Sequence, residues 1–152
     1  MLLKNKLNTL SKDYDYILID CPPNLGLLTL NAFTAVKEIF IVLQSEYLAL
    51  HGLSKLMDVI QVVKERLNPE IEISGIICTL FDGRKNLNNE VVDHIKDYFG
   101  DKVFDTIIRD NVALAEAPSH HKTIFEYAPD SHGAKDYKAL AQEIRNGQLQ
   151  HA

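Results

Sequence analysis

Asp20 is the residue whose position in this sequence most clearly suggests chemistry. It follows Tyr14–Ile19, a nearly unbroken apolar run rich in aromatic and β-branched residues, and precedes Cys21-Pro22-Pro23. An acid at the end of a buried strand is the Walker B arrangement, in which the carboxylate holds Mg²⁺, usually through water. An aspartate that caps a helix or closes a turn gives the same pattern, so both interpretations stay open.

The residues after Asp20 could form a loop that senses a phosphate group. Pro22 and Pro23 stiffen the exit from the predicted strand, and Gly26 permits a backbone conformation that other residues avoid. Main-chain amides in such a loop can bind an anion. A rigid turn without a ligand explains the same residues equally well.

Other chemically capable side chains give weaker signals. His120 and His121 are adjacent and point apart, and no Cys or acid completes a metal-ligand spacing with them. Cys21 has no nearby cation that would lower its pKa, and the adjacent Asp20 should raise it. We therefore expect surface histidines and an unreactive thiol.

The elements that must position Asp20 alternate between strands and helices. Continuous apolar runs predict strands over 14–19, 39–43, 71–80, more weakly over 103–108, and over a short segment at 123–127. Apolar residues at a helical period predict helices over 27–36, 50–67, 87–99 and 134–147. The alternation predicts a doubly wound, mostly parallel α/β sheet with helices on both faces. We expect one domain over 1–147 and a frayed tail over 148–152.

Composition narrows the class of protein. The 152 residues are 46% hydrophobic and 24% charged, which excludes a disordered or collagen-like chain. We expect neither a membrane span nor a secretory leader. Two cysteines form neither a disulfide framework nor a zinc pattern, which favours the cytoplasm. With a formal net charge of −5, any nucleic-acid binding would need a local basic patch.

Five separated segments resemble the ParA/Soj family of deviant-Walker partition ATPases, relatives of MinD. The first is the Walker B segment Tyr14–Pro23. The others follow in the order of the family and are Gln44–Leu53, Phe81–Leu87, Asn111–Ser119 and Ser131–Tyr137. The resemblance implies a P-loop NTPase-like fold and, in intact members, ATP and Mg²⁺ as cofactors. It also implies dimerisation, DNA binding and a centromere-binding, ParB-like partner.

The resemblance also implies roles for residues around the nucleotide. Asp20 would hold Mg²⁺ through water, and the loop of Pro22, Pro23 and Gly26 would report the γ-phosphate. The residues that resemble the part flanking the adenine are Arg109, Asp110 and Asn111.

DNA binding by this chain is expected to be weak. Arg84, followed by Lys85, stands where the family often carries a DNA-contacting arginine. The family typically reads Pro-Arg-Asn-Val-Arg/Lys where this sequence reads Arg-Asp-Asn-Val-Ala from Arg109 onward. A basic position has thus become Asp110 and a second has lost its charge, although Arg109 could compensate. Losing two cations from a phosphate-contacting surface weakens salt-dependent binding.

The 152 residues contain no phosphate loop. In the family this Gly-rich loop, with its two lysines, lies upstream of the Walker B strand, whereas here none of the 7 glycines is followed by Lys. The resemblance is thus to the C-terminal portion of a family member. Since backbone amides and lysine supply most of the attraction to a triphosphate, we expect this chain alone neither to hydrolyse ATP nor to bind it tightly.

Two classes of function stay open. The chain could be the C-terminal portion of an ATPase for chromosome or plasmid partitioning, or a non-enzymatic interaction module that pairs with an intact homologue or with itself. In the family the phosphate-loop strand lies beside the Walker B strand, so a sheet without it exposes an apolar edge, and self-association is expected. A phosphoacceptor receiver domain is a third possibility, which the matches downstream of Asp20 disfavour.

Overall fold

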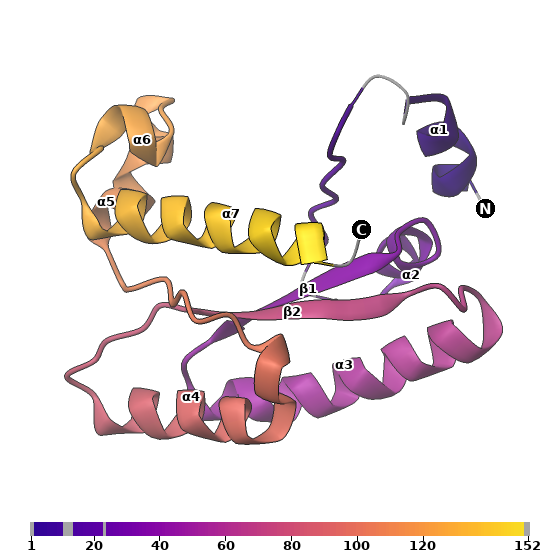
Figure 1. The fold of residues 1–152 in the computed structure, drawn as a ribbon, viewed down its shortest axis with the longest axis horizontal. Coiled ribbons are helices and arrows are strands. Elements are labelled where there is room, and N and C mark those ends of the chain that lie inside the picture. Colours follow the sequence, from indigo (N-terminus) through magenta and orange to yellow (C-terminus); the bar gives the residue numbers. More distant parts are fainter. Residues whose placement is uncertain (1, 11–13, 23, 151–152) are drawn as a thin grey trace. The chain divides into compact units, whose positions relative to one another are not determined.

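The structure is a computed structural model that describes residues 2–10, 14–22 and 24–150 (Figure 1). Its helices and strands, in chain order, are α1 (Leu2–Leu10), α2 (Leu27–Phe33), β1 (Glu38–Gln44), α3 (Tyr47–Arg66), β2 (Glu72–Thr79), α4 (Asn86–Phe99), the 3₁₀ helix η1 (Gly100–Lys102), α5 (Val112–Glu116), the 3₁₀ helix η2 (Ala117–His120), α6 (Ile124–Tyr127) and α7 (His132–Gln150). Among the described helices, none has the length and apolar character to cross a membrane.

The chain forms two compact units. The first consists of Met1–Phe40 and His51–Ser74, and the second of Ile41–Leu50 and Gly75–Ala152. In the first unit, α1 packs against α2. In the second unit, α7 lies above β2 and α4 below it in the view of Figure 1, so that helices cover both faces of this strand.

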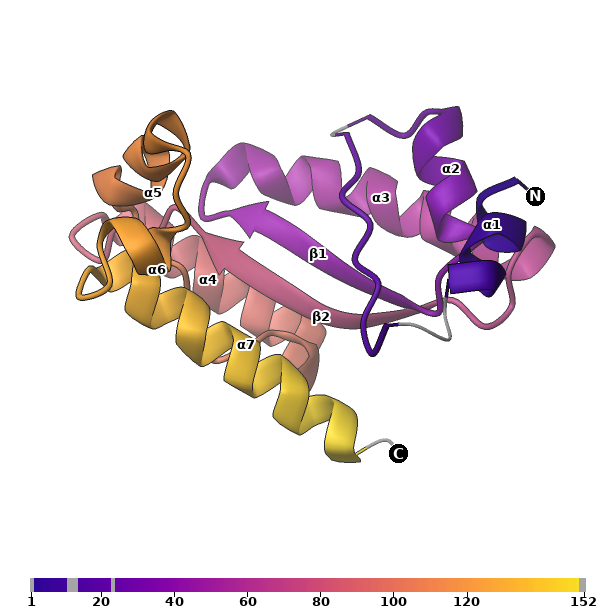
Figure 2. The same ribbon diagram turned by 90° about the horizontal axis from the view of Figure 1, so that it is seen from above.

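Strands β1 and β2 lie side by side and run in the same direction (Figure 2), joined by α3. The backbone N–H of Glu72 donates to the carbonyl of Lys37 at 2.8 Å, and that of Ser45 to the carbonyl of Thr79 at 3.0 Å. This strand–helix–strand connection confirms the predicted α/β class with a parallel sheet.

Burial differs between the two strands. In β2, the four residues 75–78 are all buried, as predicted for a strand covered on both faces. In β1, Ile39, Ile41 and Leu43 are buried, whereas the side chain of Val42 between them is 63% exposed. The prediction that β1 is buried on both faces was therefore wrong. Its alternating buried and exposed residues are typical of a strand covered on one face.

The predicted strand over 14–19 is not formed. Residues 14–22 belong to no helix or strand, and Tyr14 and Leu18 are 64% and 87% exposed. A strand needs a neighbour that pairs with its backbone, and the sheet formed by the described residues contains only β1 and β2. The apolar run predicted a buried strand for which the described part of the chain provides no neighbour.

The predicted strand over 103–108 forms only in part. It runs parallel to β2 and meets it at an isolated bridge between Val103 and Ile76, and Arg109 forms a second bridge with Phe81, beyond the end of β2. Between these bridges, the N–H groups of Asp105 and Thr106 donate to the carboxylate of Glu143 in α7, at 2.7 and 2.9 Å. The N–H groups of Phe104 and Ile108 do donate to β2, at the carbonyls of Ile76 and Cys78 (3.0 and 2.9 Å), but a side chain takes the N–H of Thr106 between them.

The predicted strand over 123–127 is wrong, because these residues begin helix α6. The hydroxyl of Thr123 accepts from the Glu126 N–H at 3.3 Å, and the Glu126 carboxylate accepts from the Thr123 N–H at 2.9 Å. This is a capping box, which satisfies two backbone donors at the start of a helix. The same hydrogen bonds hold the pKa of Glu126 below its usual value. The four predicted helices are confirmed, with shifted ends.

Gly75 in β2 is the position where an added methyl group should cost most. A Cβ atom there would lie 2.2 Å from Cε2 of Phe104. We expect Gly75→Ala to lower the free energy of unfolding by about 1 to 3 kcal/mol, measured by urea denaturation, because the ring must move. Gly52→Ala is the matched control: nothing lies within 4 Å of its added Cβ, and alanine should stabilise α3 by about 0.5 to 1 kcal/mol. Equal stability of the two variants would contradict the expectation.

Candidate functional site

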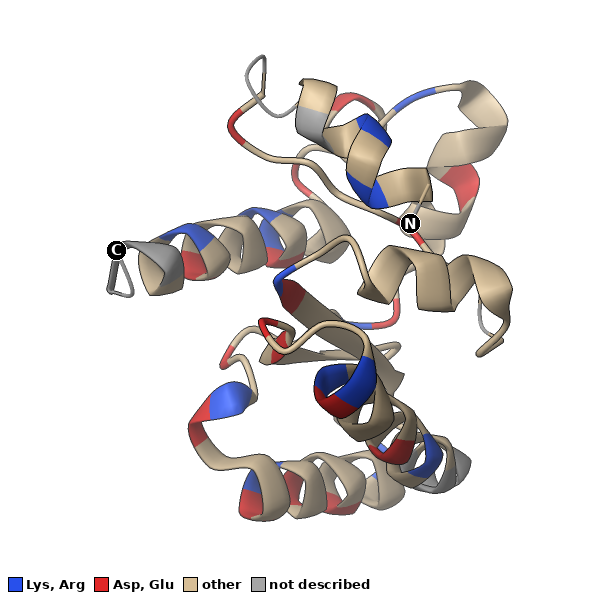
Figure 3. Cartoon of the chain, turned by 90° about the vertical axis from the view of Figure 1, so that its right-hand side faces the viewer, with Lys and Arg blue, Asp and Glu red and all other residues tan. Residues whose placement is uncertain are grey.

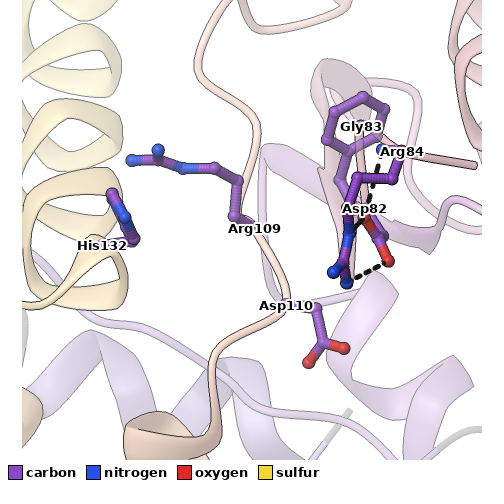
Figure 4. A pocket seen from close by; sticks show the side chains of 7 residues that line it. Asp82, Gly83, Arg84, Arg109, Asp110 and His132 are labelled. Carbon is purple, nitrogen blue, oxygen red and sulfur yellow. Dashed lines mark hydrogen bonds and ion pairs between the residues drawn. The ribbon is translucent and has the colours of Figure 1, made fainter.

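A pocket of about 210 Å³ lies in the second unit, beyond the C-terminal end of β2 (Figure 4). Loops gather at this end of parallel strands, which is where ligands of open α/β sheets bind. Three segments form the pocket: the loop after β2, the segment beside β2, and the start of α7. The lining residues are Phe81, Asp82, Gly83, Arg84, Arg109, Asp110 and His132.

The chain enters the pocket through an unusual backbone conformation. Leu80 directly follows β2 and has a φ of 52°, in the left-handed region that leucine seldom adopts. Beyond it, the Phe81 N–H donates to the carbonyl of Ile108 at 3.2 Å, and the Phe81 carbonyl accepts from the Asp110 N–H at 3.0 Å. The loop after β2 is thereby held against the segment that carries Arg109.

Asn88 in α4 ties together the loops that follow β1 and β2. It is buried, with 4% of its surface exposed. Its side-chain Nδ2 donates to the Ser45 carbonyl at 2.5 Å, and its Oδ1 accepts from the Asp82 N–H at 3.0 Å. One amide therefore sets the position of Asp82 relative to the end of β1. Sequence analysis did not identify this residue.

Arg84 is held by a carboxylate of its own loop. Its Nε and Nη2 donate to Oδ1 and Oδ2 of Asp82, both at 2.9 Å, and its backbone N–H donates to Oδ1 at 3.1 Å. The Arg84 side chain is 90% exposed and that of Asp82 15%. Hydrogen bonds from the Arg84 side chain and backbone lower the pKa of Asp82 to about 2. The ion pair is therefore present at neutral pH.

Arg109 also forms a bidentate ion pair, but the carboxylate that it contacts is buried. Its Nε and Nη2 donate to Oδ2 and Oδ1 of Asp136 in α7 at 2.9 and 2.5 Å, and its backbone N–H donates to Oδ2 at 3.1 Å. The Asp136 side chain is 10% exposed. Burial by itself raises the pKa of Asp136, but the hydrogen bonds from Arg109 outweigh it and hold this pKa below its usual value. In Figure 4 the Arg109 side chain extends toward α7, which it fastens to the segment beside β2.

The other predicted site residues of the second unit do not line the pocket. Asn111 is the N-cap of α5, and its side-chain oxygen accepts from the Ala113 N–H at 2.9 Å. Lys85 is the exposed N-cap residue of α4. The pocket thus brings together Arg84, Arg109 and Asp110 of the predicted set.

Asp20 belongs to the first unit and is exposed. Among the residues that the structure describes, no three His, Cys, Asp or Glu side chains are grouped to hold a metal ion. Asp20 therefore offers a single carboxylate, and Mg²⁺ bound in this way takes its remaining ligands from phosphates and water. As predicted, the pKa of Cys21 is raised, by burial and by the charge of Asp20.

The loop after Asp20 differs from the prediction at Gly26. This residue has a φ of −88° and a ψ of −172°, an extended conformation open to any residue, and it is the N-cap of α2. The prediction that its conformation excludes other residues was wrong. The loop is held instead by Thr29, whose hydroxyl donates to the Asn24 carbonyl at 2.7 Å. Pro22 is exposed, and Pro23 lies outside the described residues.

His120 and His121, the two histidines considered as metal ligands, have structural roles. His120 stacks on Tyr127 with a ring-centroid distance of 4.8 Å, and the Tyr127 hydroxyl donates to Glu116 at 3.1 Å. That hydrogen bond raises the pKa of Tyr127. His121 is the C-cap residue that follows η2 and has a left-handed conformation with a φ of 53°.

The fold is found in solved ATP-binding proteins. Cobyrinic acid a,c-diamide synthase of Mycobacterium smegmatis, solved with bound ADP and magnesium, matches with a TM-score of 0.78 and 29% identity over 99% of this chain and 54% of that one. A structure with an ATP analogue and magnesium matches equally well. The AAA domain family matches residues 1–73. The class defined by the fold is thus that of P-loop NTPase-like α/β proteins.

Sequence relatives narrow this class. The chain is 49% identical to the sporulation initiation inhibitor protein Soj of Bacillus subtilis over 93% of its residues, which cover 56% of that relative. It is also 49% identical to the chromosome-partitioning ATPase Soj of Treponema pallidum (97% of this chain, 59% of the relative). The chromosome partitioning protein ParA of Myxococcus xanthus is 47% identical (93% and 50%). The chain is therefore a homologue of the Soj/ParA partitioning proteins, and it spans 50 to 59% of the length of these relatives.

Proposed function

We propose that this chain is the Walker B-bearing portion of a Soj/ParA-type chromosome-partitioning ATPase, acting in the cytoplasm, and that it does not hydrolyse ATP alone. Identity of 49% to Soj of B. subtilis over 93% of the chain carries the proposal. The absence of a G-K-[ST] phosphate loop from the 152 residues supports its second part. Both ADP and an ATP analogue, each with magnesium, occupy solved structures of the same fold.

In this proposal Asp20 and the loop after it contribute to binding Mg²⁺ and phosphate. Asp20, exposed at the end of its extended segment, would contribute one ligand to Mg²⁺. When bound, the ion neutralises charge on the nucleotide phosphates. Pro22, Pro23 and Gly26 would form the loop that reports the γ-phosphate. The hydrogen bond from Thr29 to the Asn24 carbonyl supports this role, because it fixes the loop without using the backbone N–H groups that a phosphate would need.

By its resemblance to the family, the segment 109–111 would be the part that flanks the adenine. The side chain of Arg109 is committed to Asp136, and that of Asn111 to the N–H of Ala113. Of the three side chains, the exposed carboxylate of Asp110 is the one left to face a base.

DNA is proposed as a weak partner, alongside a ParB-like protein. The net charge of −5 opposes binding to phosphates. Figure 3 shows Lys and Arg interspersed with Asp and Glu along the helices. Both arginines of the pocket are paired with carboxylates.

A non-enzymatic interaction module is the second candidate, and exposed apolar side chains of the first unit favour it. Leu18, Leu27 and Leu28 are 87%, 85% and 73% exposed. Apolar surface of this kind and an extended segment outside the sheet are features through which chains associate. Self-association or pairing with a longer homologue would cover them.

Phosphate release from ATP tests the first part of the proposal. The chain alone, at millimolar ATP and Mg²⁺, is expected to release no phosphate above a protein-free blank, because it lacks the amides and lysine that hold a triphosphate. A full-length Soj protein is the positive control. Magnesium-dependent turnover by the chain, lost in Asp20→Ala, would contradict the expected inactivity.

A further inference from the structure

The first turns of α7 belong to a segment that the proposed function does not use. Ser131–Tyr137 is one of the segments that resemble the family, yet only His132 of this segment lines the pocket. Gly133 and Asp136, which are both buried, lie three residues apart and therefore on one side of the helix. This side faces the segment 109–114, which contributes residues to the wall of the pocket.

We propose that Gly133 is a positioning residue for the segment 109–114. It leaves room for Leu114 at one end of this segment, while Asp136 holds Arg109 at the other end. Gly133 acts through the segment and contacts no ligand itself. The consequence for a nucleotide rests on the proposed function, in which 109–111 flanks the adenine. A displaced segment then weakens binding of the base and leaves binding of the phosphates unchanged.

The close approach of α7 to α5 requires glycine at position 133. A Cβ atom there would lie 2.7, 2.9 and 3.0 Å from Cγ, Cδ2 and Cδ1 of Leu114. Distances this short force one of the two partners to move. Rotation about the Cβ–Cγ bond of Leu114 moves only its methyl groups and leaves the overlap with Cγ. We therefore expect an added side chain at position 133 to displace α5.

Asp136 holds the other end of the segment through the backbone as well as the side chain. The bridge between Phe81 and Arg109 uses the Ile108 carbonyl and the Asp110 N–H, and it does not use the Arg109 N–H. This N–H donates to Oδ2 of Asp136 at 3.1 Å, in addition to the two hydrogen bonds from the guanidinium. The beginning of the segment is thus fixed between Phe81 and α7.

Hydrogen bonds within the segment connect its two ends. The side-chain oxygen of Asn111 accepts from the Ala113 N–H at 2.9 Å, and the Asn111 carbonyl accepts from the Leu114 N–H at 3.0 Å. A shift of Leu114 is therefore passed to Asn111 and to the residues before it. Because Arg109 and Asp110 line the pocket, the shift changes the pocket wall.

Hydrogen exchange of backbone amides in the chain alone, resolved by residue with NMR, tests the positioning. The reporters are N–H groups of the segment that donate hydrogen bonds, namely those of Asp110, Ala113 and Leu114. The Phe104 N–H, which donates to the Ile76 carbonyl at 3.0 Å, is the reference for opening of the second unit. Circular dichroism confirms that each variant is folded.

Gly133→Ala is expected to raise the exchange rate of the reporters about tenfold relative to the reference, because overpacking destabilises this local contact. Leu114→Ala removes all three atoms that the added Cβ would meet, so Gly133→Ala/Leu114→Ala should exchange like Leu114→Ala. Gly147→Ala is the matched control in α7, because no described atom lies within 4 Å of its added Cβ, and it should exchange like wild type. Equal rates in the two glycine variants, or faster exchange that the Leu114 change does not relieve, would overturn the proposal.

A second measurement tests the consequence for the base. The chain is mixed with the N-terminal portion of a Soj relative that carries a phosphate loop, and isothermal titration compares ATP with tripolyphosphate, which has no base. Gly133→Ala should weaken ATP binding about tenfold, the value of one hydrogen bond, and leave tripolyphosphate binding unchanged. Equal losses for both ligands would overturn the selective effect on the base.

The two measurements separate a failure of this proposal from a failure of the proposed function. Faster exchange in Gly133→Ala with unchanged ATP binding would support the positioning and contradict the adenine role of 109–111. A mixture that binds neither ligand would likewise contradict the proposed function, while the exchange rates of the chain alone still decide whether Gly133 positions the segment.

Discussion

Asp136→Ala is expected to lower the free energy of unfolding by about 2 to 3 kcal/mol, measured by urea denaturation at neutral pH. The change removes a 10% exposed carboxylate that accepts three hydrogen bonds from Arg109, including its backbone N–H. The loss falls below that of a fully buried pair, because 44% of the Arg109 side chain reaches solvent and because alanine favours the helix. Lys138→Ala, at an exposed position of the same helix, should change stability by less than about 0.5 kcal/mol.

The same pair predicts a dependence on pH. The pKa of Asp136 is lower in the folded chain than in the unfolded one, so its ionised form stabilises the fold above the unfolded value of about 3.9. This stabilisation is lost as the pH falls through the lower, folded value. The stability difference between wild type and Asp136→Asn should therefore shrink below about pH 4. A difference that stays constant into acid would show that the charge of Asp136 does not contribute.

Supplying a phosphate loop is expected to produce the largest change in nucleotide binding. When the N-terminal portion of a Soj relative that carries this loop is added, the affinity for ATP with Mg²⁺ should rise about a hundredfold or more. Two charge-assisted hydrogen bonds from the loop suffice for this gain. Isothermal titration of the chain alone, the fragment alone and the mixture measures it. No gain in a mixture that associates would favour the interaction module.

The periodicity of apolar residues correctly predicted the helices and strands whose pattern lies entirely within the element itself. Helix α3, for example, follows the predicted stripe that contains the buried residues Leu53, Ile60 and Val63. Strand β2 follows from its apolar run. The segment 14–19 had an equally strong pattern, but strand formation depends on a neighbour, and an apolar run does not reveal whether the same chain provides one.

Two errors had local signals that could have corrected them. Thr123 and Glu126 have the S/T-x-x-E spacing of a capping box, which predicts a helix start where a strand was expected. The helix predicted over 87–99 begins with the apolar residue Leu87, but this residue is 51% exposed and the buried face of α4 begins at Asn88. The strand prediction followed the β propensity of Ile124 and Phe125. The helix prediction followed the hydrophobicity of Leu87.

The candidate site was predictable only where its contacts are local. Asp82 and Arg84 are two residues apart in a turn, so their pairing follows from the sequence once the turn is recognised. Arg109 and Asp136 are 27 residues apart. Their contact depends on how α7 packs beside β2, which no spacing reveals. Arg109 therefore stood as a ligand-binding candidate, although the structure gives its side chain a structural partner.

The proposed role of Asp20 in binding Mg²⁺ can be tested most directly in the mixture of the chain with the phosphate-loop fragment. The measurement is the Mg²⁺-dependent affinity for ATP, compared between wild type, Asp20→Ala and Asp15→Ala. Asp15 is an exposed acid of the same segment and provides the matched control. We expect Asp20→Ala to lose about tenfold in affinity with Mg²⁺ present and little without it, while Asp15→Ala binds as wild type does. Equal affinity of all three proteins for ATP with Mg²⁺ would contradict the assignment of Asp20 to a metal–nucleotide site.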